Sequence, residues 1–201
     1  MANTKRSTPA PEGQGTLTER ARRAQLVEVT IELVADRGYA GASLARIAER
    51  AGITKAAVLY HFSSKAAVVE AAYEHVLTAL TGSIASAVEA APVADGPAAY
   101  IRSMVGYLNE NPRHTRMIVE SMIEEGTAAE PPQRWQALAQ ILDAARDATV
   151  GRPLEDSRTL AIIIGGAVDA IVGEQLNDPA YDTVTAAEQL VSLVNARLRE
   201  P

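Results

Sequence analysis

Apolar positions along the chain recur at three- and four-residue intervals, the spacing of a helix with one buried face. The first such face follows Thr16 and consists of Ala24, Val27, Ile31 and Val34. No window alternates between apolar and polar residues with the period of two that a half-buried strand requires. From residue 16 onward the pattern therefore predicts an all-α fold.

Residues that start and stop helices divide this pattern into about nine segments. Thr16 and Glu19 have the spacing of a capping box, and Gly38 suits the left-handed end of the first helix. Ser43 and Thr54 are N-cap residues before two short helices. Prolines, which fit the first turn of a helix but not its interior, restart the chain five times later on. The predicted helices span residues 16–37, 44–50, 55–62, 65–90, 97–110, 112–125, 132–149, 154–176 and 180–199.

Composition narrows the class of protein. Cysteine is absent from the 201 residues, which excludes disulfides, thiolate metal sites and cysteine nucleophiles. The three histidines lack the spacing of metal ligands on one helix, and no catalytic or phosphate-loop motif occurs. We therefore expect no cofactor, no metal and no enzymatic activity.

The N-terminal residues 1–15 contain several prolines and glycines and no apolar periodicity, so we expect a disordered basic arm rather than a secretory signal. The most apolar stretch, residues 160–173, carries Asp169 and is shorter than the roughly 20 residues of a membrane span. These features favour a cytoplasmic protein that does not interact with membranes.

Charge is divided unevenly along the chain. Residues 1–65 hold ten basic and six acidic side chains, a net +4, whereas residues 66–201 hold nine basic and nineteen acidic ones, a net −10. A basic end on an acidic body suggests that only this end meets a polyanion, although counts this small also arise by chance.

The two short helices have the pattern of a helix-turn-helix. Gly52 lets the chain reverse between them, and Ala48 is small where two crossing helices would touch. In a helix-turn-helix the second helix lies in the major groove of DNA. An ordinary pair of antiparallel helices in a bundle remains the alternative. The side chains that would point inward together are Ile47, Ala48, Ala51, Ile53 and Val58.

Residues 16–65 resemble the DNA-binding domain of the TetR family of transcriptional regulators. The matching segments are residues 35–39 at the end of the first helix, Ser43, residues 47–55, His61-Phe62 and Ser64-Lys65. The resemblance implies a DNA-binding domain over residues 16–64 and a helical ligand-binding and dimerisation domain over residues 65–201. It also implies a homodimeric repressor that a small molecule releases from DNA.

The resemblance assigns DNA contacts by position. Ser43, Thr54, His61 and Lys65 match the family's phosphate-contacting positions. The base-reading positions are those of Lys55, Ala56, Ala57 and Tyr60. The chain departs from the family at Val58-Leu59, where the family often has Leu-Tyr, so Tyr60 is a candidate to replace that tyrosine. Because the alanines offer no hydrogen bond, base reading should depend on Lys55, Tyr60 and contacts to thymine methyl groups.

Two further surfaces are predicted in the second domain. The helix near residues 160–173 is apolar nearly all round, and small residues recur along it at helical spacing, so it suits a four-helix interface between two copies. A tight core within one chain is the alternative. The predicted dimer residues are Ala167, Ala170, Gly173, Leu190, Leu193, Val194 and Leu198.

A ligand pocket is predicted among the middle helices, because such pockets are mostly apolar with a few polar groups. Met and aromatic side chains at helical spacing are also typical of a plain core. The candidates are Tyr100, Met104, Tyr107, Leu108, Met117, Met122, Trp135, Ile141 and Asp169.

The sequence thus predicts a ligand-responsive, homodimeric repressor that binds double-stranded operator DNA and an unknown small molecule. The alternative is a helical small-molecule-binding or interaction protein that does not bind DNA.

Overall fold

The computed structural model describes residues 16–124, 135–151 and 154–200. These residues form nine α-helices and a short 3-10 helix, and none of them forms a strand, so the all-α prediction is confirmed. The arm predicted over residues 1–15 lies outside the described residues. The elements are α1 (Leu17–Gly41), α2 (Leu44–Ala51), α3 (Lys55–His61), α4 (Lys65–Ala90), η1 (Val93–Asp95), α5 (Gly96–Glu110), α6 (Pro112–Glu124), α7 (Gln136–Val150), α8 (Ser157–Asn177) and α9 (Thr183–Arg199).

The local stop and start signals act as predicted. The Thr16 hydroxyl accepts from the Glu19 N–H and the Glu19 carboxylate accepts from the Thr16 N–H, which completes the capping box of α1. The long helix α4 begins at Lys65 and ends at Ala90, as predicted. The first helix differs, because α1 continues to Gly41. It is nevertheless kinked at the predicted stop, where Gly38 has φ 69°.

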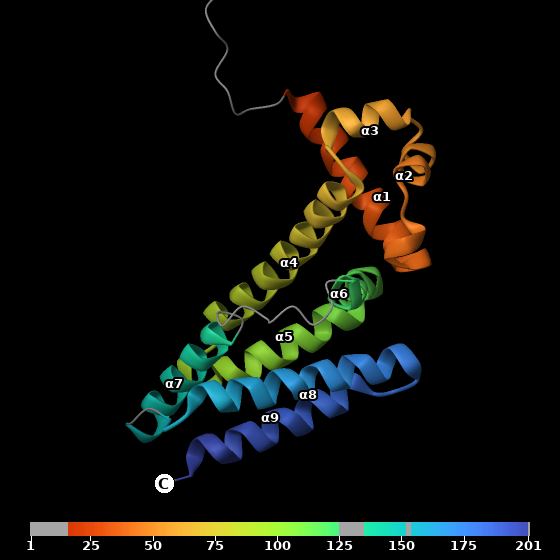
Figure 1. Ribbon diagram of the computed structural model, residues 1–201. Helices are drawn as coiled ribbons and strands as arrows, with labels where there is room; N and C mark the ends of the chain where they lie inside the picture. The colour runs from red at the N-terminus through yellow and green to blue at the C-terminus, as the bar shows by residue number, and fades with distance from the viewer. Residues whose placement is uncertain (1–15, 125–134, 152–153, 201) are drawn as a thin grey trace, which may run out of the picture.

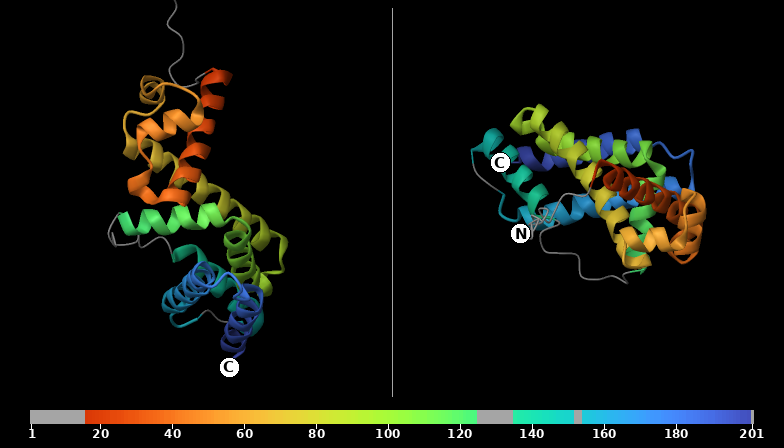
Figure 2. Two further views of the ribbon diagram at one scale, coloured as in Figure 1. Left: turned by 90° about the vertical axis from the view of Figure 1, so that its right-hand side faces the viewer. Right: turned by 90° about the horizontal axis from the view of Figure 1, so that it is seen from above.

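The chain is elongated, with α1, α2 and α3 at one end and α7, α8 and α9 at the other (Figures 1 and 2). Each end has its own apolar core. The long helix α4 connects them, since Val68 and Val76 pack into the first core and Leu80 and Ile84 into the second.

Helix α6 lies against the end of the molecule that holds α1. Met117 is fully buried in the first core, together with Leu26 and Val34 of α1. The prediction that Met117 lines a ligand pocket in the second domain is therefore wrong. Met117 belongs to one of the middle helices in the sequence, but the chain turns at Asn111 and carries α6 back towards α1 (Figure 2).

Helix α8 is longer than the apolar stretch indicated. It spans 21 residues, so by length and composition it is one helix of the described chain that could cross a membrane, and the argument from shortness was wrong. A core helix of a globular protein passes the same test. One side of α8 packs in the second core through Ile164 and Val168. Only 28% of its most apolar window is buried within the chain, which leaves an apolar side uncovered.

Candidate nucleic-acid interface

Helices α2 and α3 form the predicted helix-turn-helix. Ile47 and Val58, one from each helix, are completely buried, and Ala48 is 4% exposed where the helices meet. Gly52 ends α2 in the left-handed conformation, with φ 68° and ψ 32°, which a residue with a side chain adopts only at a cost. The inward-facing set predicted from the sequence is therefore the packed set, with Ile53 half-buried.

The side of α3 opposite Val58 faces solvent. Lys55 and Ala56 are exposed, and Tyr60 is 74% exposed. Ala57 is half-buried, so it contributes less of this surface than the sequence suggested. Leu59, the residue at which the chain departs from the family pattern, is 42% exposed. Helix α3 lies at one end of the molecule (Figure 1), so these exposed side chains are accessible from outside.

The first turns of α1 lie beside α3 and hold two of its residues. The Tyr60 hydroxyl donates to the Glu19 carboxylate at 3.1 Å. The Thr16 backbone N–H and this hydroxyl both lower the pKa of Glu19, and the same bond to Glu19 raises the pKa of Tyr60. Arg23 donates to the carbonyl of His61 and stacks over the ring of Phe62. Sequence reasoning missed Glu19 and Arg23 because their partners lie about forty residues away along the chain.

Two of the predicted phosphate contacts are N-cap hydroxyls. Ser43 Oγ accepts from the Arg46 N–H at 3.3 Å, and Thr54 Oγ1 accepts from the Ala57 N–H at 3.1 Å. A capping hydroxyl uses its oxygen as an acceptor, so its hydrogen stays available for a phosphate oxygen. Both groups are therefore fixed in position by the helices they start.

The other two predicted phosphate contacts, His61 and Lys65, are not N-cap residues. Half-buried His61 lies edge-on to the Tyr60 ring. Lys65 is also half-buried, and its Nζ donates to the Tyr39 carbonyl at 2.6 Å while lying 3.8 Å from the centre of the Tyr39 ring. An ammonium has three donors, so this contact leaves two for other acceptors. Lys65 thus stabilises the last turn of α1, beyond the kink at Gly38, a role the sequence did not indicate.

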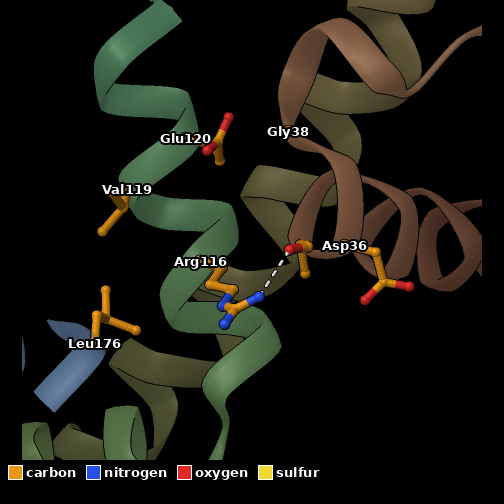
Figure 3. A pocket seen from close by; sticks show the side chains of 7 residues that line it. Asp36, Gly38, Arg116, Val119, Glu120 and Leu176 are labelled. Atoms are coloured by element: carbon orange, nitrogen blue, oxygen red, sulfur yellow. Dashed lines mark hydrogen bonds between the residues drawn. The ribbon is translucent and has the colours of Figure 1, made fainter. Parts of the chain in front are cut away.

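Helix α6 contacts the same turn from the other side. The Glu120 carboxylate accepts from the Tyr39 N–H at 3.1 Å, and Arg116 donates to the Ala35 carbonyl at 3.4 Å. These side chains border an open cleft of about 310 Å³ between α1, α6 and the end of α8 (Figure 3). The turn that leads into the helix-turn-helix is therefore held by α4 through Lys65 and by α6 through Glu120.

A network of two salt bridges also joins α6 to α1 and α2. Glu32 of α1 pairs with Arg113 of α6 at 3.3 Å and with Arg50 of α2 at 3.0 Å. All three side chains are partly exposed, so each pair contributes little to stability on its own. Together they connect α6 to the helix-turn-helix through one residue of α1.

The predicted ligand residues do not form one group. Leu108 is buried in the second core, and Tyr100, Met104, Tyr107 and Trp135 pack half-buried against it. Ile141 is half-buried and faces the start of α5, with its Cγ2 3.1 Å from the position of a Cβ on Gly96. Asp169 is on the exposed side of α8. Met117 belongs to the first core. The side chain of Met122 lies outside the part of the chain that the structure describes.

Tyr107 carries the clearest polar contact in this group. Its hydroxyl lies 2.7 Å from Nδ1 of His114 on α6, and the Asn111 side chain donates to its carbonyl. Burial raises the pKa of Tyr107 and lowers the pKa of His114, which favours the uncharged form of each group. The pair connects α5 to α6, next to the contact of α6 with α1.

The predicted dimer residues divide into two sets. Leu190, Val194 and Leu198 are 9%, 4% and 3% exposed, because α9 turns this side towards the second core of its own chain. Their assignment to a dimer interface is wrong, and the alternative of a core within one chain holds for them. Leu193 is 69% exposed and Ala170 is exposed, while Ala167 and Gly173 are half-buried. Leu193 and Ala170 therefore remain on the outer side of α9 and α8, whereas Ala167 packs against the second core of its own chain.

A family of known proteins matches the segment that contains the helix-turn-helix. Residues 26–72 match the family described as "Bacterial regulatory proteins, tetR family". Two curated relatives, each described as "HTH-type transcriptional regulator BetI", are 37% identical over 84 residues in Burkholderia thailandensis and 36% identical over 84 residues in Pseudomonas aeruginosa. The similarity spans only 42% of this chain and 42% of each relative.

Solved structures share the fold over nearly the whole chain. A TetR-like transcriptional regulator from Rhodococcus sp. RHA1 has a TM-score of 0.72 at 16% identity, covering 90% of this chain and 97% of its own. The fatty acid degradation regulator FadR from Bacillus halodurans has a TM-score of 0.70 at 18% identity, covering 94% and 100%. FadR from Bacillus subtilis in complex with stearoyl-CoA has a TM-score of 0.64 at 18% identity, covering 86% and 97%.

The geometry and the comparisons agree. A packed helix-turn-helix stands at one end of an all-α chain, residues 26–72 match the family, and the fold of the whole chain is that of its TetR-like structural neighbours. Within residues 26–72 the chain thus contains a helix-turn-helix segment that matches the tetR family of bacterial regulatory proteins.

Proposed function

We propose that the chain is a non-enzymatic transcriptional regulator, a homodimeric repressor that a small molecule releases from a palindromic operator. In this proposal residues 16–64 bind DNA, and residues 65–201 bind the ligand and the second copy. The first half of α4 and Met117 of α6 pack into the core of the DNA-binding end, so the second domain is in direct contact with the first. Transcriptional regulators act on DNA in the cytoplasm, which is where we place this one.

The exposed surface of α3 is the observation that carries DNA binding. The helix is held against α1 and α2 by buried Val58 and keeps Lys55, Ala56 and Tyr60 accessible. A second helix presented in this way fits the major groove of B-DNA. The net positive charge of residues 1–65 adds the electrostatic attraction on which DNA affinity depends.

The uncovered side of α8 and α9 supports dimerisation. Ile163 of α8 is 60% exposed and Leu193 of α9 is 69% exposed. Gly166 and Ala170, three and seven residues after Ile163 in α8, are also exposed. Small residues let two helices approach closely, and exposed branched residues gain from burial. Two copies joined here would form a four-helix interface and carry two recognition helices.

Half-buried aromatic side chains support ligand binding in the second domain. Tyr100, Tyr107 and Trp135 pack against its core, and Tyr107 contacts His114 of α6. A ligand that moves α6 would disturb the Glu120–Tyr39 contact at the entrance to the helix-turn-helix. Because a structural neighbour was solved with stearoyl-CoA, acyl-CoA thioesters belong in the first set of compounds to test.

DNA binding is tested by selecting bound duplexes from a random pool with the full chain. We expect a palindromic site whose affinity falls steeply with salt, because phosphate contacts release counterions. Lys55→Ala should change the preferred sequence at a cost of about 1–3 kcal/mol. If no duplex is enriched, the chain is instead a helical binding or interaction protein without DNA binding.

Dimerisation is tested by Ala170→Glu, with Ala85→Glu on an exposed position of α4 as the matched control. In an isolated monomer both substitutions are at exposed positions, so each should change the unfolding free energy by less than about 0.5 kcal/mol. Between two copies the charge at residue 170 would be buried without a partner, at roughly 3 kcal/mol or more. Sedimentation should show monomers only for Ala170→Glu. A parent protein that is monomeric at micromolar concentration would refute the interface.

Ligand control is tested by titrating each compound that raises the melting temperature, with and without saturating operator. Linkage requires that an inducer bind more weakly when operator is present, by the factor by which it weakens operator binding. A compound whose affinity is unchanged by operator is not the inducer.

A further inference from the structure

The outward surface of α3 offers few hydrogen-bonding groups. Successive residues of a helix are rotated by about 100°, so Ala56 and Tyr60 lie almost opposite buried Val58, and Leu59 lies beside them. Leu59 and Ala56 carry no donor or acceptor. The exposed side chains of this helix are those of Lys55, Ala56, Leu59 and Tyr60. Two of these four, Ala56 and Leu59, are therefore purely apolar.

The polar group on the outermost side of α3, the Tyr60 hydroxyl, already has a hydrogen-bond partner. The Tyr60 hydroxyl donates to Glu19 at 3.1 Å, and the carboxylate of Glu19 is itself fixed by the capping box of α1. In this arrangement Tyr60 presents its ring, while its hydroxyl proton points to α1. Lys55 is the exposed side chain of α3 whose donors the described contacts leave open for a base edge.

Base pairs differ in the major groove by their donors, their acceptors and one apolar group, the 5-methyl of thymine. An aliphatic side chain can recognise only the last of these. We propose, on the basis of the DNA-binding function above, that Leu59 is a specificity-determining residue that reads a thymine methyl group in each half-site. Ala56 assists because its small side chain lets α3 approach the base edges closely.

Uracil substitution in a selected operator tests this contact directly. Uracil pairs as thymine does and lacks only the 5-methyl group, so charge and hydrogen bonding are unchanged. Burying one such group is worth about 0.8 kcal/mol, which is roughly a fourfold change in affinity. We expect this loss at one or two thymines of a half-site, and about fifteenfold when the symmetric position in the other half-site is also substituted.

Leu59→Ala identifies the side chain responsible. It should weaken binding to the thymine operator and bring the thymine-to-uracil affinity ratio at one position close to one. Tyr60→Phe is the matched control, because it removes the bond to Glu19 and keeps the ring, and it should leave that ratio unchanged. Leu59 is partly exposed, so the variant should keep the parent's helical circular dichroism and melting curve, which excludes misfolding.

The outcomes separate the two proposals. If the operator binds but no thymine shows a loss on uracil substitution, Leu59 does not read methyl groups. The same conclusion follows if Leu59→Ala keeps the parent's ratio at every position. If the parent enriches no duplex at all, DNA binding itself fails, and with it the basis of this inference.

Discussion

Gly165 of α8 lies directly against the indole of Trp135, the single tryptophan of the chain. A Cβ on residue 165 would lie 1.9 Å from Cζ3 and 2.4 Å from Cη2 of this ring. No real carbon atom approaches another so closely without a covalent bond, so Gly165→Ala must push the indole away from α8. Because Trp135 packs against the second core just before α7, the change also tests how this part of the proposed ligand-binding domain is held.

Two opposing effects set the magnitude. Extra volume in a packed region costs about 1–3 kcal/mol of unfolding free energy. Replacing glycine by alanine inside a helix stabilises it by about 1 kcal/mol. We therefore expect a net loss of about 0–2 kcal/mol, smallest if the ring can rotate away freely. Gly82→Ala is the matched control, since residue 82 lies within α4 and a Cβ there meets nothing within 4 Å.

The two variants should differ by about 1–3 kcal/mol in denaturant unfolding, because the helix-propensity gain is common to both. Tryptophan fluorescence gives a second readout. In Gly165→Ala the emission should shift to longer wavelength as the indole moves into water, and in Gly82→Ala it should match the parent. Equal stabilisation of both variants with unchanged emission would refute the packing of Trp135 on Gly165.

Three further changes test the connection between the two ends of the molecule. Lys65→Met keeps the aliphatic stem but removes the charged bond to the Tyr39 carbonyl, so the unfolding free energy without DNA should fall by about 1.5–3 kcal/mol; an unchanged value means that Lys65 only meets phosphate. Glu120→Ala removes the acceptor for the Tyr39 N–H and should cost about 0.5–1.5 kcal/mol and weaken operator binding. Glu120→Gln keeps an acceptor, so it should lose less unfolding free energy and less operator affinity than Glu120→Ala. Equal losses in the two variants would contradict the role of residue 120 as an acceptor for the Tyr39 N–H. Burial holds the pKa of His114 below its ordinary value near 6.5, so below that pH the unfolded chain takes up a proton that the folded chain resists, and stability should fall as pH drops from 7.5 to 5. In unfolding measured across this range, His114→Gln should reduce the loss, and a pH dependence identical to the parent's would show that His114 contributes nothing to it.

Helix boundaries could be predicted from the sequence because their causes are local. The capping box of Thr16 and Glu19 and the N-caps Ser43 and Thr54 act within four residues, and the structure places α1, α2 and α3 accordingly. The kink at Gly38 and the turn at Gly52 depend on the conformation of one residue each. The helix-turn-helix was recognised for the same reason, since its pattern fits within about twenty consecutive residues.

The sequence could not predict the contacts that hold α3 against the start of α1, or those that hold the end of α1 against α4. Glu19 with Tyr60, and Lys65 with Tyr39, are polar pairs separated by 41 and 26 residues. A periodic pattern shows that such side chains are on the surface, but it does not show which other surface they face. That choice depends on the crossing of α1, α3 and α4.

Burial against the same chain or against a second copy was decided only by the tertiary structure. The apolar side of α9 predicts that Leu190, Val194 and Leu198 are covered, and they are, by the core of their own chain rather than by a partner. Met117 likewise was correctly read as apolar and was assigned to the wrong core. The hydrophobic effect is non-directional, so a sequence specifies that a helix face is buried, and only the packing of all helices determines what covers it.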